Sequence, residues 1–172
     1  WLTQEDGVLW RQASYRFHAL VANKWRAGRV FVAGDAAHQQ PPFLGQGMCQ
    51  GVRDVVNLCW RLDATLKGQA SEKLLDSYGL ERKAHVIDLT TRIKEIGKII
   101  TERDPVKARA RDEKLLADCA GVVKPTPRQD VQPALRDGLL SATHHPARGT
   151  IFPQPLLLQP DGAQIQIGRA HV

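Results

Sequence analysis

The feature that most constrains this chain is residues 30–48, VFVAGDAAHQQPPFLGQGM. Residues 30–33 are apolar and end in Gly34-Asp35, a pattern that predicts a short buried strand. A glycine at that point lets another backbone or a ligand approach closely, because no Cβ intervenes. Two prolines, a Gly-x-Gly triplet and an amphipathic helical pattern follow. The order of strand, acidic turn, stiff loop and helix predicts an α/β fold with a binding loop where these elements meet.

The loop residues suggest how a ligand would be held. Asp35 can accept hydrogen bonds from the hydroxyls of a ribose or ribitol, and it can equally cap the turn that follows. Pro41 and Pro42 fix two φ angles and remove two N–H donors, which suits either a ligand-binding loop or a rigid surface connector. Residues 45–47 place glycines at a helix start, where unpaired N–H groups favour an anion.

Before this loop, the sequence predicts two small elements. Residues 14–20 alternate well enough for a strand, with Tyr15, Phe17 and Ala19 on one face. Residues 21–28 suggest a short helical turn closed by Gly28.

After the loop, three helices are expected. Apolar residues recur at spacings of three and four over residues 47–67. A second apolar stripe predicts a helix over residues 71–103, with Arg82 as its one polar position and Gly97 as a weak point that costs about 1 kcal/mol relative to alanine. Pro105 can open a third helix that reaches about residue 120.

From residue 121 the composition changes. Seven of the ten prolines lie between Pro125 and Pro160, so we expect residues 121–166 to be extended coil with short strands. The apolar patch at residues 149–158 is a candidate edge strand. The last residues, 167–172, match one reading frame of a common sequencing-adapter DNA, and we exclude them from fold reasoning. Together with a start at Trp1, they lead us to expect a piece of a longer gene.

Composition excludes several classes of function. The net charge is +6, but the basic residues are spread over predicted helices without interleaved aromatic residues, so we expect a solvated surface and no nucleic-acid partner. The sequence contains no run of 18 apolar residues, so we expect no transmembrane helix. We expect a cytoplasmic location by default. The three cysteines form no Cys-x-x-Cys pair, so we expect neither a disulfide framework nor a zinc site.

Other candidate catalytic groups are weak. His38 could be catalytic, but we favour a loop histidine bonded to backbone. His144-His145 lack a carboxylate or cysteine at ligand spacing, so no metal is expected. Ser77 has no nucleophile-elbow context, which argues against a hydrolase, and no catalytic residue is assigned.

Taken together, the motifs resemble one family closely. The chain is similar to the class A FAD-dependent aromatic-ring monooxygenases, the para-hydroxybenzoate hydroxylase-like enzymes, over at least residues 15–118. "GQGMC" and the "FPQP" of residues 152–155 resemble the 3-(3-hydroxyphenyl)propionate hydroxylase subgroup. The residues that match the family pattern are Gly34 to His38, Pro41, Pro42, Gly45 to Gly47, Asp54, Asn57, Leu58, Trp60, Ser77, Tyr78, Glu81 and Arg82.

This resemblance implies a fold and an activity. Residues 1–120 would be the C-terminal part of a Rossmann-like FAD-binding domain, a strand, loop and long helix followed by further helices, with a Pro-rich extended tail over 121–166. The parent enzyme would use FAD, NAD(P)H and O₂ to hydroxylate a phenolic substrate such as 3-(3-hydroxyphenyl)propionate. The family's first FAD motif, Gly-x-Gly-x-x-Gly after a strand, is absent here, so we expect this chain alone to be inactive and to hold FAD weakly.

The resemblance also implies the cofactor contacts. Asp35 would bond the ribitol, Pro41-Pro42 would lie beside the isoalloxazine ring, and the backbone of residues 45–48 would face its N1 and O2 side. Cys49 stands where most of the family has Asn, which puts a direct side-chain bond at that position in doubt. The expected cofactor-binding residues are Gly34, Asp35, Ala36, Pro41, Pro42, Gly45, Gln46, Gly47, Met48 and Cys49.

Two alternatives stay open at this point. A related flavoenzyme with other chemistry, such as a halogenase or a polyketide-type hydroxylase, would share the same motifs. The other is a non-catalytic basic module that binds nucleic acid.

Overall fold

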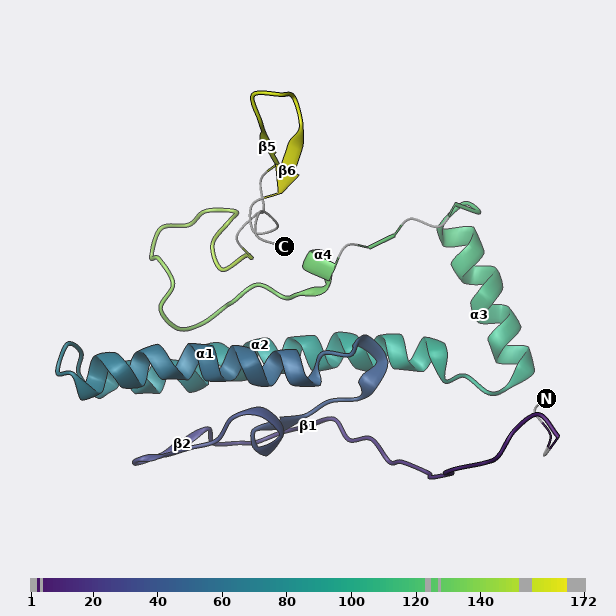
Figure 1. Ribbon diagram of the computed structural model, residues 1–172, viewed down its shortest axis with the longest axis horizontal. Helices are drawn as coiled ribbons and strands as arrows, with labels where there is room; N and C mark the ends of the chain where they lie inside the picture. Colours follow the sequence, from purple (N-terminus) through teal and green to yellow (C-terminus); the bar gives the residue numbers. More distant parts are fainter. Residues whose placement is uncertain (1–2, 4, 123–124, 127, 152–155, 167–172) are drawn as a thin grey trace.

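Two long helices form the centre of the molecule. The computed structural model describes residues 3, 5–122, 125–126, 128–151 and 156–166. Helix α1 (Gly47–Leu66) and helix α2 (Lys73–Ile100) pack side by side, joined by a short turn (Figure 1). Short strands lie along one side of this pair, and residues 128–151, called the tail below, lie along the other. Helix α3 (Pro105–Asp118) leaves the far end of α2 at an angle.

The helix predictions are confirmed almost to the residue. Helix α1 fills the predicted 47–67, and α2 lies within 71–103. Helix α3 begins at Pro105 because Asp104 caps it, accepting hydrogen bonds from Val106 N at 2.9 Å and Lys107 N at 3.2 Å.

The strand predictions before the loop are largely wrong. Of the predicted strand at 14–20, only Leu20 lies in one, and residues 14–19 are irregular and exposed, since no described strand runs beside them to complete a ladder. Residues 21–28 form no helical turn. Instead β2 (Arg26–Ala27) pairs with β3 (Val30–Phe31) across a turn at residues 28–29. The predicted buried strand over 30–33 is only these two residues, and Val30 is 67% exposed.

The rest of the loop region is built from short turns. Strand β1 (Leu20–Val21) pairs antiparallel with β4 (His38–Gln39). Two single-turn 3-10 helices flank β4, η1 (Gly34–Ala36) before it and η2 (Pro42–Leu44) after it. The loop is therefore a chain of short, closely joined elements that ends at the start of α1.

The tail contains one further short helix, and a hairpin follows it. Helix α4 (Arg128–Val131) is held by Arg92, which donates to the carbonyls of Asp130 and Val131. Strand β5 (Leu156–Leu158) pairs with β6 (Gln164–Gln166), and within the described residues this is the only part of the 149–158 patch in a strand. The "FPQP" segment and residues 167–172 lie outside the described residues. No helix in the described ranges combines the length and apolar run needed to cross a bilayer.

A small aromatic core joins the strands to the helix pair. Trp25 stacks on His38 at 5.6 Å between ring centroids, and its ring meets the edge of Tyr78 at the same distance. Leu58 and Val86 complete the buried cluster from α1 and α2. The Tyr78 hydroxyl donates to the Val32 carbonyl at 2.9 Å, and burial raises the pKa of this phenol. This hydrogen bond fastens α2 to the segment that enters the loop.

Replacing Tyr78 with Phe tests this fastening. The change leaves the Val32 carbonyl without its donor in a partly buried place, so the free energy of unfolding should fall by about 1–2 kcal/mol in urea denaturation. The matched control is Tyr15→Phe, because Tyr15 is 64% exposed and its loss of a hydroxyl should cost nothing measurable. Equal stabilities for the two variants would contradict the proposed role of the bond.

Candidate functional site

One buried carboxylate holds the loop to both helices. Asp54 of α1 has no solvent exposure. Its Oδ2 accepts hydrogen bonds from Gly34 N at 3.0 Å and from His38 Nε2 at 2.7 Å, and its Oδ1 accepts from Arg82 Nε at 2.8 Å. Burial raises the pKa of this carboxyl, but the hydrogen bonds from His38, Arg82 and Gly34 outweigh burial and hold the pKa below its usual value. Asp54 is therefore an ionised tie between loop, α1 and α2.

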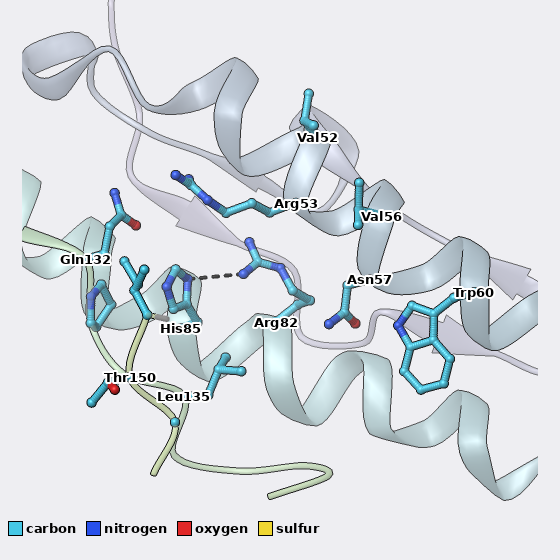
Figure 2. A pocket seen from close by; sticks show the side chains of 13 residues that line it. Val52, Arg53, Val56, Asn57, Trp60, Arg82, His85, Gln132, Leu135 and Thr150 are labelled. Carbon is cyan, nitrogen blue, oxygen red and sulfur yellow. Dashed lines mark hydrogen bonds between the residues drawn. The ribbon is translucent and has the colours of Figure 1, made fainter. Parts of the chain in front are cut away.

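Arg82 extends this network across α2. Its Nη2 donates to Gln50 Oε1 at 2.6 Å, and its Nη1 donates to His85 Nδ1 at 3.2 Å (Figure 2). Arginine has no acceptor, so His85 Nδ1 must accept, which requires a neutral ring. Burial, followed by the positive charge of Arg82, lowers the pKa of His85 to about 4. The sequence contains one indication of this network, because Arg82 is the one polar residue in the predicted apolar stripe of α2.

His38 corrects one prediction. We expected it to bond to backbone, but its Nε2 donates to the Asp54 carboxylate and its ring stacks on Trp25. It is 3% exposed. The histidine therefore positions the loop through a side-chain partner.

A second buried ion pair joins the helices, about two turns further along α1. Arg61 Nη2 and Glu81 Oε2 are 2.6 Å apart, and Asn57 Nδ2 donates to the same carboxylate oxygen at 2.8 Å. Ser77 Oγ accepts from Arg61 Nε at 2.8 Å and donates to the Leu74 carbonyl. The serine is thus engaged in a structural network, and no described histidine bonds to it.

The start of the loop is pressed against α1. Gly34 has φ +59°, and a Cβ on Gly51 would lie 3.4 Å from the Gly34 Cα. A Cβ at either position would meet the other glycine in ordinary van der Waals contact, so it is the positive φ of Gly34 that favours glycine there. With Gly34 held inward, the next residue, Asp35, is exposed to solvent.

The middle of the loop is fastened to α2. The Phe43 ring, in η2, occupies the space that a Cβ on Gly97 would need. Gly97, predicted only as a weak point of the helix, therefore makes room for this ring. Gln40 Nε2 donates to Thr90 Oγ1 at 2.8 Å. Pro41 and Pro42, between these two contacts, are consequently held in place from both sides.

These constraints leave an open pocket in front of α1. It has a volume of about 810 Å³. Six of the ten expected cofactor residues line it, namely Asp35, Pro41, Pro42, Gly45, Gly47 and Met48. Its other lining residues, which the sequence analysis did not assign to a site, are Arg16, Phe17, His18, Gln39 and Gln40. Arg16, Phe17 and His18 belong to the segment predicted as a strand. Nothing in the sequence of that segment indicated that it lines a site.

The four remaining expected residues lie elsewhere. Ala36 lines a smaller adjoining pocket of about 250 Å³ that shares Asp35. Gln46 is buried, and its Oε1 accepts from Arg53 at 3.2 Å. Gly34 faces Asp54, and Cys49 is half-buried in the first turn of α1.

The chemistry of the larger pocket follows from the end of α1. Gln46, at the N-cap, makes no side-chain capping bond, and the first turn carries no acidic residue. The N–H groups of this turn and the helix dipole therefore favour a polar acceptor or an anion at the mouth of the helix. Asp35 provides an exposed acceptor for hydroxyl groups on the same pocket. The described residues contain no group of three histidine, cysteine or acidic side chains that could hold a metal ion.

Comparison with known proteins finds a clear family match. Residues 5–93 match the family model described as "FAD binding domain". The chain is 43% identical over 157 residues to a probable NADH-specific resorcinol 4-hydroxylase from Rhodococcus jostii, covering 91% of this chain and 28% of the relative. It is 39% identical over 160 residues to a 3-(3-hydroxy-phenyl)propionate/3-hydroxycinnamic acid hydroxylase from Mycolicibacterium vanbaalenii, covering 84% of this chain and 27% of that relative. The chain thus spans little more than a quarter of these relatives.

The fold also matches a solved structure. The crystal structure of aklavinone-11 hydroxylase with FAD and aklavinone superposes with a TM-score of 0.59 at 28% identity, covering 89% of this chain and 29% of that one. The mixed helix and strand arrangement is therefore that of the FAD-binding part of flavin hydroxylases.

Replacing Asp54 with Asn tests the central tie. The change leaves Arg82 buried without its counter-charge, so the free energy of unfolding should fall by about 3–5 kcal/mol in chemical denaturation. Asp63→Asn is the matched control on the same helix, since Asp63 forms an exposed pair with Lys67 that should contribute less than about 1 kcal/mol. A loss no larger than that of the control would show that the loop is held by other contacts.

His85 generates a pH dependence whose sign is defined. Its pKa is about 4 in the folded chain against 6.5 as the ordinary value, so the unfolded chain takes up the proton first as the pH falls. Stability should drop by roughly 3 kcal/mol between pH 6.5 and pH 4, at about 1.4 kcal/mol per pKa unit. The Asp54 contribution, from a lowered carboxyl pKa, is lost only below that window.

His85→Gln should flatten the slope between pH 6.5 and pH 4, because a glutamine oxygen can still accept from Arg82 and does not titrate. Urea denaturation at a series of pH values measures this slope of stability against pH. His18→Gln, at an exposed position, should leave the slope unchanged, and a slope that persists in His85→Gln would assign it to another group.

Proposed function

This chain belongs to the FAD binding domain family, and from that premise we propose that it forms the ribitol and isoalloxazine side of the FAD site in an enzyme that hydroxylates phenolic rings. The observation that carries the proposal is the convergence of six expected residues on one open pocket at the uncapped start of α1. Contacts with Asp54, Thr90 and Gly97 position the loop through the protein's own side chains and backbone.

The described residues fit the cofactor chemically. Asp35 would accept hydrogen bonds from the ribitol hydroxyls, and Pro41-Pro42 would form a rigid wall beside the ring. The N–H groups at the start of α1, from Gly47 onward, would favour the negative charge that reduced flavin carries near N1. Bound FAD would supply the electron transfer and the activation of O₂. The protein's part is to orient the ring, hold its charge without a mobile cation and limit water around it.

We propose the same division of the chain that the sequence suggests. Residues 1–120 would be the C-terminal part of a Rossmann-like FAD-binding domain, residues 121–166 a Pro-rich extension, and residues 167–172 a foreign end. The contacts of the tail with α2, such as Leu139 N with Glu81 Oε1 at 2.9 Å, support an extension that wraps the helix pair.

The substrate proposal rests on the relatives. The names of these relatives refer to resorcinol, 3-(3-hydroxyphenyl)propionate and 3-hydroxycinnamic acid, all single-ring phenols, and one relative is called NADH-specific. We therefore assign a single-ring phenolic substrate, O₂ and NAD(P)H to the intact enzyme, acting in the cytoplasm without a nucleic-acid or membrane partner. A polyketide-type hydroxylase is the second candidate, favoured by the fold match to aklavinone-11 hydroxylase but at lower identity.

A chimera tests the proposal in an intact enzyme. Residues 5–93 of this chain would replace the matching segment of the Mycolicibacterium vanbaalenii hydroxylase. The purified chimera should retain FAD and oxidise NAD(P)H faster when 3-(3-hydroxyphenyl)propionate is added. Asp35→Ala in the chimera should weaken FAD binding about tenfold or more, because a charge-assisted acceptor for the ribitol is lost. FAD content, by absorbance after gel filtration, measures this.

The control for the chimera is Asp63→Ala, which removes an exposed acid on α1 outside the pocket and should leave the FAD content unchanged. A folded chimera that holds no FAD would overturn the proposal. A chimera that holds FAD equally well with Asp35→Ala would overturn the role of Asp35 alone.

A further inference from the structure

A second pocket lies on the other side of the helix pair. It is bounded by α1, α2 and the tail and has a volume of about 420 Å³ (Figure 2). It shares no lining residue with the pocket in front of α1. Nothing in the proposed FAD site therefore accounts for it, and the inference below does not depend on that proposal.

The walls of this pocket are mainly apolar. Val52, Val56 and Trp60 contribute from α1, and Leu135 and Ile151 contribute from the tail. The volume lies within the range of small-molecule sites and suits a single aromatic ring with a short substituent.

The pocket contains an arginine whose charge is not matched. Arg53 donates from Nη1 to the neutral Gln46 Oε1 at 3.2 Å, and no carboxylate among the described residues pairs with it. The neighbouring Arg82, by contrast, is paired with Asp54. Burial, followed by the charge of Arg82, lowers the pKa of Arg53, although an arginine stays protonated at neutral pH. Figure 2 shows Arg53, Arg82 and His85 gathered between the helices and the tail.

Two unsatisfied acceptors complete the polar part of the site. Asn57 and Gln132 both line the pocket, and the buried oxygens Asn57 Oδ1 and Gln132 Oε1 have no hydrogen-bond partner in the described part of the chain. The amide nitrogens of the same two side chains are already used, by Glu81 and by Gln46 respectively. Buried acceptors of this kind favour a ligand that brings hydroxyl donors.

We propose that this pocket binds a small aromatic carboxylate, with its carboxylate on Arg53 and its ring between the apolar walls of α1 and the tail. A ring hydroxyl would donate its one hydrogen bond to Asn57 Oδ1 or to Gln132 Oε1. The ligand supplies the negative charge that Arg53 lacks, in a partly desolvated place where a charge-assisted bond is strong. The apolar walls select an aromatic acid over inorganic anions.

The test uses the 172-residue chain and three probes, namely benzoate, 3-hydroxybenzoate and benzyl alcohol. Binding is followed by ¹H–¹⁵N NMR, with the indole N–H of Trp60, which lines the pocket, as reporter. Benzoate should give saturable shifts, 3-hydroxybenzoate should bind more tightly than benzoate, and benzyl alcohol should bind at least about tenfold more weakly. Benzyl alcohol binding as tightly as benzoate would overturn the role of the carboxylate, and unchanged spectra with all three would overturn the site.

Variants separate the charge from the fold. Arg53→Gln should weaken benzoate binding about tenfold or more, and Arg53→Lys should restore part of it. Arg109→Gln, on exposed α3, is the control of equal charge change and should bind as the parent chain does. Val56→Phe, at a position 64% exposed, should fill the pocket and abolish binding with the helical circular dichroism unchanged. Benzoate affinity that is the same in Arg53→Gln and Val56→Phe as in the parent would refute the assignment.

Discussion

The structure depends on a buried charge that is fully paired. Taking the Asp54 carboxylate and the Arg82 guanidinium out of water costs several kcal/mol for each ion, and only good geometry with further hydrogen bonds offsets that cost. Here Gly34 and His38 bond the carboxylate, while Gln50 and His85 bond the guanidinium. Because each partner comes from a different element, the network fixes the register of α1, α2 and the loop together.

This network gives the helix pair two different faces. On one face, the inward pull on Gly34 turns Asp35 outward beside the uncapped start of α1, and the loop carries the proposed cofactor contacts. On the other face, Arg82 and His85 form the floor against which the tail packs, and the second pocket opens between them. One hydrogen bond links the two faces. Arg53, which lines the second pocket, donates to the side chain of Gln46, the residue just before α1 at the proposed cofactor loop.

The sequence predicted the parts of this fold that depend on local periodicity. Long apolar stripes identified α1 and α2, and Asp104-Pro105 marked the start of α3, because a helix satisfies its own backbone bonds. A strand needs a neighbouring strand for its backbone bonds, and within the predicted 14–20 only Leu20 has one among the described residues. The polar position in the stripe of α2 signalled a buried partner but could not name it. The positions of Asp35, Pro41 and Pro42 on one pocket were expected, whereas Arg16, Phe17 and His18 were not.

The sequence by itself determined the family, the three main helices and the residue types at the proposed cofactor loop, since these follow from short-range patterns and spacing. Only the tertiary structure decided which polar residues face inward. Asp54 meets Arg82, 28 positions away, and Gln132 meets Gln46, 86 positions away, and no local pattern encodes such contacts. The tertiary structure likewise decided that Arg53 forms no ion pair with a described carboxylate, because pairing depends on every element packed around the side chain.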